Sequence, residues 1–108
     1  MVHTSSNVHR AYIMYTTDIN GSWSSMNLWG SYTSAGTAMY DITYANGYWV
    51  AVGVERNSDS YMGKVAYASD LGDTWSSTTL YTMRTQSSPV QCVTYAEGYW
   101  VIGGYRRT

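Results

Sequence analysis

The ionisable side chains limit the chemistry open to this sequence, which has seven carboxylates, five arginines and one lysine. Hydrolysis of a glycosidic bond needs two carboxylates at a defined separation. The acids are Asp18, Asp41, Glu55, Asp59, Asp70, Asp73 and Glu97, and the arginines are Arg10, Arg56, Arg84, Arg106 and Arg107. Asp18 and Asp70 stand in turn sequences, and the other acids form no arrangement typical of an active site. The sequence therefore predicts a protein that is not an enzyme, with a glycosidase as the alternative.

Two similar turn sequences place an aspartate five residues before a tryptophan. Asp18 and Asp70 lie 52 positions apart, as do Trp23 and Trp75. An aspartate can close a turn by accepting hydrogen bonds from the backbone N–H groups just ahead of it. We expect Gly72 to adopt a positive φ in this turn, and Asn20, at the equivalent position, to tolerate it.

A second pair of segments repeats with nearly the same period. Residues 42–53 read ITYANGYWVAVG and residues 93–104 read VTYAEGYWVIGG, with eight of twelve positions identical and an offset of 51. Internal periods of this size are typical of propellers, solenoids and other arrays. The Asn46-Gly47 pair between strand-like runs predicts a tight hairpin, and Glu97-Gly98 takes its place in the second copy.

The aspartate turns resemble the Asp box, S/T-x-D-x-G-x-T-W, of sialidase-type (BNR-repeat) β-propellers. In the second copy the matching residues are Asp70, Gly72, Thr74 and Trp75, while Ala68 stands in place of Ser or Thr. In the first copy they are Thr16, Asp18 and Trp23, while Asn20 replaces Gly and Ser22 replaces Thr. The resemblance covers nearly the whole chain after the first few residues. It implies a structural turn in a blade hairpin and no particular activity.

The alternation of strand-like runs and turns predicts an all-β chain of eight strands. We expect them over Arg10–Thr17, Ser22–Leu28, Met39–Ala45, Tyr48–Val54, Gly63–Ser69, Thr74–Leu80, Val90–Ala96 and Tyr99–Gly104, with longer loops over Trp29–Ala38, Glu55–Met62 and Tyr81–Pro89. Four-stranded repeats of this length are typical of propeller blades.

The repeats are out of phase with the ends of the chain, which we interpret as one two-blade propeller unit spanning residues 1–108. Residues 39–80 would form a complete blade, residues 9–28 a half-blade of its third and fourth strands, and residues 90–105 a half-blade of its first and second strands. Exposed strand edges favour pairing with other chains. We therefore expect copies of the chain to complete each other's half-blades in a closed ring. Sialidase-like propellers have six blades, which favours a homotrimer; a homotetramer and a fragment of a larger propeller are the alternatives.

The sequence favours a binding module, and carbohydrate is the leading ligand because planar rings stack on sugars while polar side chains bind hydroxyls. The architecture is similar to that of small oligomeric propeller lectins. The candidate ligand-binding residues, expected in loops or at strand ends, are Trp29, Tyr32, Arg56, Asn57, Asp59, Tyr61, Tyr81 and Arg84. We expect the tryptophans of the aspartate turns and of the repeated Tyr-Trp pairs to pack between blades instead. A structural or protein-interaction ring, for example in a virion, is the alternative function.

Other partners are disfavoured by composition. Charged residues make up only 12% of the chain and the net charge is −1, so no basic surface for nucleic acid is expected. No run is long enough for a membrane span. His3 and His9 lack a convincing ligand set, so we expect neither a metal nor another cofactor. Cys92 is alone, which precludes an intrachain disulfide. The N-terminal residues do not read as a signal peptide. The sequence does not identify the compartment, and it is compatible with an extracellular or a virion-associated protein.

Overall fold

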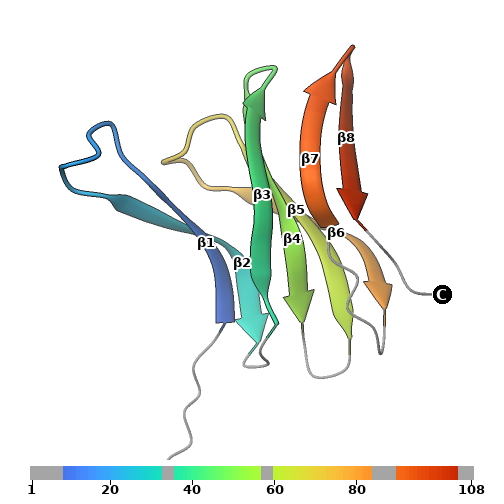
Figure 1. Ribbon diagram of the computed structural model, residues 1–108. Coiled ribbons are helices and arrows are strands. Elements are labelled where there is room, and N and C mark those ends of the chain that lie inside the picture. Colours follow the sequence, from blue (N-terminus) through green and yellow to red (C-terminus); the bar gives the residue numbers. More distant parts are fainter. Residues whose placement is uncertain (1–8, 33–35, 57–59, 84–89, 105–108) are drawn as a thin grey trace, which may run out of the picture.

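The computed structural model describes residues 9–32, 36–56, 60–83 and 90–104, and these form eight antiparallel strands (Figure 1). The strands are β1 (His9–Tyr15), β2 (Ser24–Tyr32), β3 (Ala38–Ala45), β4 (Tyr48–Arg56), β5 (Tyr61–Ala68), β6 (Ser76–Met83), β7 (Val90–Ala96) and β8 (Tyr99–Gly104). They make three sheets, β1-β2, β3-β4-β5-β6 and β7-β8, and none of these closes on itself over the described residues. The all-β class predicted from the sequence is confirmed.

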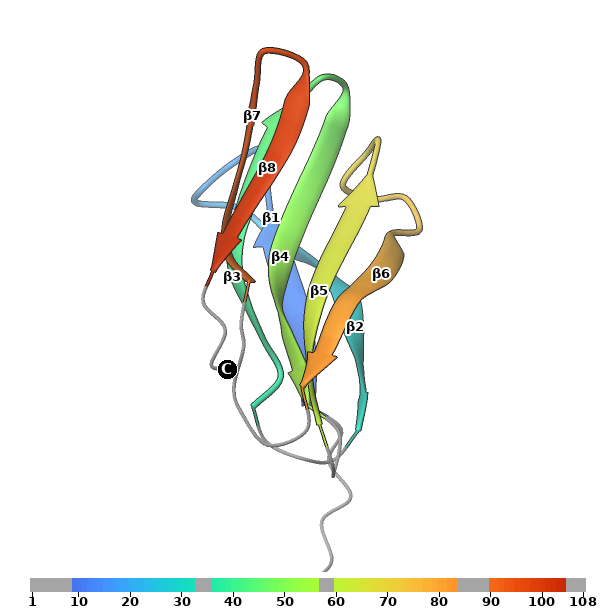
Figure 2. The same cartoon turned by 90° about the vertical axis from the view of Figure 1, so that its right-hand side faces the viewer.

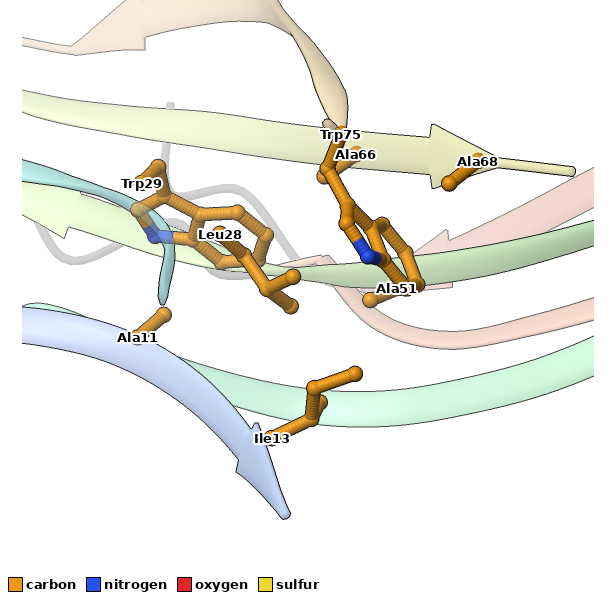
Figure 3. Packing of buried hydrophobic residues seen from close by; sticks show 8 residues of the cluster. All are labelled: Ala11, Ile13, Leu28, Trp29, Ala51, Ala66, Ala68 and Trp75. Atoms are coloured by element: carbon orange, nitrogen blue, oxygen red, sulfur yellow. The ribbon is translucent and has the colours of Figure 1, made fainter. Parts of the chain in front are cut away.

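The four-stranded sheet lies between the two hairpins, which cover its opposite faces (Figures 1 and 2). On one side β1 packs against β3 and β2 packs against β4 and β6; on the other, β7 packs against β3 and β4. Successive residues of β4 point to opposite faces. Ala51 is therefore buried toward β1-β2, and Val50 and Val52 are buried toward β7-β8. The first interface, which we call the β1-β2 core, contains Trp29, Leu28 and Trp75 (Figure 3).

The sequence repeat is also a repeat of strand register. In β3-β4 Tyr44 pairs with Trp49, and in β7-β8 Tyr95 pairs with Trp100. The ring centroids of the two pairs lie 5.0 and 4.8 Å apart. Each hairpin has an irregularity at the same place, between residues 39 and 41 in the first and 90 and 92 in the second. The hairpins β1-β2 and β5-β6 likewise share their register and an irregularity, at residues 11–12 and 63–64.

The two tight hairpin turns have the backbone expected for Asn-Gly. Asn46 and Gly47 have φ angles of 52° and 83°, and Glu97 and Gly98 have 52° and 85°. Positive φ at both central residues is the type I′ arrangement that matches the twist of the flanking strands. The hairpin predicted at each position is thus present, although Glu97 occupies a region that side chains other than Asn and Asp rarely adopt.

Replacing Glu97 with asparagine should stabilise the protein, because asparagine enters the left-handed region at lower cost. We expect the free energy of unfolding to rise by about 1 kcal/mol, as measured by urea denaturation. The converse change, Asn46→Glu, should lower it by a similar amount. Equal stabilities for the wild type and the two variants would contradict the assigned turn geometry.

The aspartate turns follow the predicted hydrogen bonding but use a different backbone conformation. Asp18 Oδ1 accepts a hydrogen bond from the Asn20 N–H, and Asp70 Oδ1 accepts one from the Gly72 N–H, both at 3.1 Å. The Asp73 N–H donates to the Asp70 carbonyl at 3.0 Å. Gly72 and Asn20 do not adopt the positive φ that we expected. A type I turn needs no left-handed residue, which explains how Asn and Gly can exchange at this position.

A side chain at position 72 should therefore be tolerated. A Cβ there would meet only the Tyr15 hydroxyl, at 3.5 Å. We expect Gly72→Ala to raise the free energy of unfolding by up to about 1 kcal/mol, since it restricts the unfolded chain. Gly47→Ala, at a φ of 83°, is the matched control and should lower stability by about 1 kcal/mol. Destabilisation by both substitutions in a denaturation series would show that position 72 needs glycine.

Three predicted loops are shorter than expected because the strands continue into them. β2 runs on to Tyr32, where the sequence indicated a loop from Trp29, and Gly30 allows this with a φ of 119° beside the backbone of His9 and Arg10. β4 extends to Arg56 and β5 begins at Tyr61, within the loop expected over Glu55–Met62. β6 likewise continues to Met83.

Candidate functional site

Two of the aromatic residues proposed to bind ligand pack against other side chains of the chain, Trp29 fully buried and Tyr81 partly buried. Trp29 is buried in the β1-β2 core, where its Nε1 donates a hydrogen bond to the Val54 carbonyl at 3.0 Å. Tyr81 is partly buried against the cluster between the central sheet and β7-β8, with its ring directly over Gly63. Both lie within strands rather than in loops. The expectation that they lie in loops or at strand ends is therefore wrong, since both rings pack within the single chain, while their role in ligand binding stays a prediction.

Arg56 and Tyr61 are the candidate ligand residues that the structure brings together. They are paired across β4 and β5, and the guanidinium carbon of Arg56 lies 5.0 Å from the centroid of the Tyr61 ring. Both are partly exposed. The remaining candidates lie outside the described residues: Asn57, Asp59, Arg84 and the side chain of Tyr32.

The described carboxylates are largely used in structural contacts. Besides the two turn aspartates, Asp41 accepts hydrogen bonds from the Ile42 N–H at 2.8 Å and from the Val93 N–H at 3.0 Å. Glu55 forms an ion pair with Lys64. Among the described residues, no three His, Cys, Asp or Glu side chains cluster closely enough to hold a metal ion.

Asp41 links the central sheet to the third sheet, since one carboxylate oxygen binds the backbone of β7. We expect Asp41→Ala to lower the free energy of unfolding by about 1.5–3 kcal/mol, because a charge-assisted hydrogen bond is lost. Hydrogen exchange at the Val93 amide should accelerate more than at other β7 amides. Asp73→Ala, which removes an exposed carboxylate, is the control and should change stability by less than about 0.5 kcal/mol. An unchanged exchange rate at the Val93 amide would contradict the hydrogen bond between Asp41 and Val93.

Lys64 and Glu55 form a buried ionic pair in the central sheet. The Lys64 Nζ lies 3.5 Å from Glu55 Oε1, and the two side chains are only 10% and 7% exposed. Lys64 also donates to the Thr79 hydroxyl at 2.9 Å, across the β5-β6 pair. The contacts extend over three neighbouring strands and fix charged groups inside the sheet rather than in an open cleft.

Two apolar grooves lie beside the edge strands of the hairpins. The first, which we call the β8 groove, has a volume of about 270 Å³ and is lined by Tyr48, Val50, Val65, Tyr67, Val93, Trp100 and Ile102. The second, the β1 groove, has a volume of about 620 Å³ and is lined by Tyr12, Ile13, Met14, Tyr15, Thr16, Trp23, Met39, Ile42, Trp49 and Leu71. Each groove opens between a hairpin and the central sheet.

Equivalent residues of the two repeats differ in exposure, and one of the exposed members, Trp23, lines the β1 groove. Trp75 is 8% exposed, whereas its equivalent Trp23 is 48% exposed. The same contrast separates Val50 from Val101, at 7% and 53%. Leu28, at 6%, and its equivalent Leu80, at 40%, differ in the same way. Within each pair, the buried member faces a neighbouring sheet of the same chain. The exposed member therefore lies on a surface whose equivalent is covered elsewhere in the molecule.

Comparisons with known proteins found no matching family model, no matching curated protein and no matching solved structure. Across the described residues there is also no helix with the length and apolarity that crossing a membrane requires.

Proposed function

We propose that this chain is a non-enzymatic binding module that works as a closed homo-oligomeric β-propeller and takes carbohydrate as its ligand. The observation that carries the ring is the exposure difference between equivalent residues, above all Trp23 and Trp75. Fully burying a large apolar side chain stabilises a protein by roughly 1.5–3 kcal/mol. A second copy of the chain that covered Trp23, Val101 and Leu80 would stabilise the assembly by several such contributions.

The strand count supports a closed assembly. Two hairpins, β1-β2 and β7-β8, correspond to the two halves of the four-stranded sheet, so one half from each of two neighbouring copies would make a complete blade. Each chain then contributes two blades, and three chains give the six blades of a sialidase-like ring. Four chains give eight. A head-to-tail interface of this kind closes only when its rotation matches a whole ring.

The ligand proposal rests on Arg56 and Tyr61, which lie together where β4 ends and β5 begins. A tyrosine ring offers an apolar face to a sugar, and a guanidinium offers several donors to hydroxyl groups. The symmetric ring would present this pair once per chain. Since the described carboxylates Asp18, Asp41 and Asp70 hold backbone groups, binding without hydrolysis is the expected activity.

The experiment combines the mass of the assembly with glycan screening. Light scattering should give three times the chain mass of 12.1 kDa, with a monomer at micromolar concentration contradicting the ring. The assembled protein should bind sugars on an array, and Tyr61→Ala should abolish that binding while the mass stays unchanged. Glu97→Asn, at the other end of the sheets, is the control and should bind as the wild type does. Protein partners without any sugar binding would instead support a structural ring.

A further inference from the structure

We infer that neighbouring copies join by pairing β8 of one chain with β1 of the next, antiparallel and in the register that β4 and β5 have within the chain. This inference rests on the proposed ring and specifies how it is held together. Within the described residues, β8 pairs only with β7, and β1 only with β2. Their repeat equivalents, β4 and β5, pair with each other from Trp49 and Ala68 to Arg56 and Tyr61. The unpaired edges are therefore complementary strands of one interrupted sheet.

The β8 groove continues the interface between the central sheet and β7-β8, and this continuity indicates that a second copy of the chain fills it. Four residues that line this groove, Val50, Val65, Val93 and Trp100, also belong to the packed cluster between the central sheet and β7-β8. The groove is thus the open side of that cluster, next to β5. In the β1-β2 core, the equivalent place is closed by the hairpin β5-β6, through Ala66, Ala68 and Trp75. The repeat equivalent of this hairpin is β1-β2, which a second copy of the chain supplies.

The register follows from the pairs in the central sheet. Ala51 pairs with Ala66 and Val50 pairs with Tyr67. With the repeat offsets of 51 and 52, these become Ile102 opposite the partner's Met14, and Val101 opposite the partner's Tyr15. The neighbouring pairs are Trp100 with the partner's Thr16, Gly103 with the partner's Ile13, and Gly104 with the partner's Tyr12.

The side chains placed together by this register are complementary in character. Ile102 and Met14 are exposed in the single chain at 39% and 54%, whereas their equivalents Ala51 and Ala66 are both fully buried. Trp75 and Leu28 lie together in the β1-β2 core (Figure 3). Applied to their repeat equivalents, the same arrangement places Trp23 of the partner subunit against Leu80. The exposed apolar residues of one copy thus meet those of the next. A slip of two residues would keep the faces but place Ile102 opposite the partner's Tyr12, and a slip of one residue would turn the apolar side chains outward.

Engineered disulfides test the register on the full chain with Cys92 replaced by serine. Directly opposed residues in antiparallel strands have Cα atoms about 4.5–5.5 Å apart, within the range that a disulfide spans. Ile102→Cys with Met14→Cys should give covalent multimers on mild oxidation, reversed by reductant. The control, Ile102→Cys with Tyr12→Cys, represents the two-residue slip and should stay uncrosslinked. A second in-register pair, Val101→Cys with Tyr15→Cys, lies on the other face of the sheet and should crosslink as the first does.

Failure of the register and failure of the ring give different results. An assembly of the expected mass that crosslinks through the Tyr12 pair, or through neither in-register pair, would overturn the register and leave the ring. A monomer of unchanged mass without covalent multimers would overturn both. Should the cysteine variants fold poorly, hydrogen exchange of the unmodified protein decides: amides of β1 and β8 should gain protection as the concentration rises, and an absence of such protection in an assembled ring would overturn the pairing.

Discussion

Replacing Trp75 with alanine is expected to lower the free energy of unfolding by about 3–5 kcal/mol. The indole is buried in the β1-β2 core, and its Nε1 donates to the Leu71 carbonyl at 3.2 Å. It packs in the same cluster as Leu28 and Ala51, so its removal leaves a cavity between two sheets (Figure 3). The cost is large because the indole links β1-β2 to the central sheet. Urea denaturation at a protein concentration too low for the proposed assembly should measure this loss directly.

The matched variant Trp23→Ala separates folding of the chain from assembly. Trp23 occupies the equivalent place in the first repeat but is half-exposed in the single chain. We therefore expect its removal to change the stability of the monomer by less than about 1 kcal/mol, as is usual for exposed positions. The same substitution should shift the proposed ring to monomer, because Trp23 would be an anchor of its interface. Similar losses of monomer stability for both variants, with an unchanged assembly in Trp23→Ala, would contradict the proposal that a second copy of the chain buries Trp23.

Much of the fold was open to prediction because its signals are local or repeated. The strands β7 and β8 have the predicted bounds, and the turns at Asn46-Gly47 and Glu97-Gly98 lie where the sequence places them. A type I′ turn fixes the register of the hairpin around it. The internal repeat added information that one copy lacks: Glu97 alone is a weak turn residue, but its equivalence to Asn46 identifies it as one.

The strand ends were predicted less well, because composition and backbone conformation diverge there. Residues 29–38 contain two glycines and several hydroxyl side chains, which are typical of loops. Gly30 instead serves a bulge in which β2 passes close to the backbone of β1. Trp29 consequently lies inside the protein and not at a surface. Tyr81 was likewise expected in a loop but lies in β6, and its packing on Gly63 depends on a partner strand that no local pattern reveals.

Contacts between distant segments were the part that sequence could not supply. The sequence indicated only that Asp41 belongs to no arrangement of acids typical of an active site, yet its carboxylate accepts a hydrogen bond from the Val93 N–H in the next sheet. Of the candidate ligand residues, Arg56 and Tyr61 are adjacent because the pairing of β4 and β5 continues into the stretch that was expected to be a loop. Which side chains face a groove is decided by the arrangement of three sheets, which composition does not encode.

The buried pair of Lys64 and Glu55 is the contact whose loss should most affect the central sheet after that of Trp75. Glu55 was expected in a loop because it opens a polar stretch, but β4 continues through it and places its carboxylate near the Lys64 ammonium of β5. Burial of a charge without a partner is costly, since water no longer solvates it. The equivalent of Lys64 in the first repeat is Tyr12, so the ionic pair belongs to the complete sheet alone.

Lys64→Met should therefore lower the free energy of unfolding by about 3 kcal/mol, because the carboxylate of Glu55 loses its cation and Thr79 loses a donor. Adding Glu55→Leu should recover most of this loss, since replacing both members of a buried pair with apolar residues is often neutral or stabilising. Denaturation of the wild type, both single variants and the double variant gives the coupling energy. Additive losses of unfolding free energy in the double variant would show that the two side chains act independently. The ion pair would then contribute nothing to the stability of the sheet beyond backbone pairing and apolar packing.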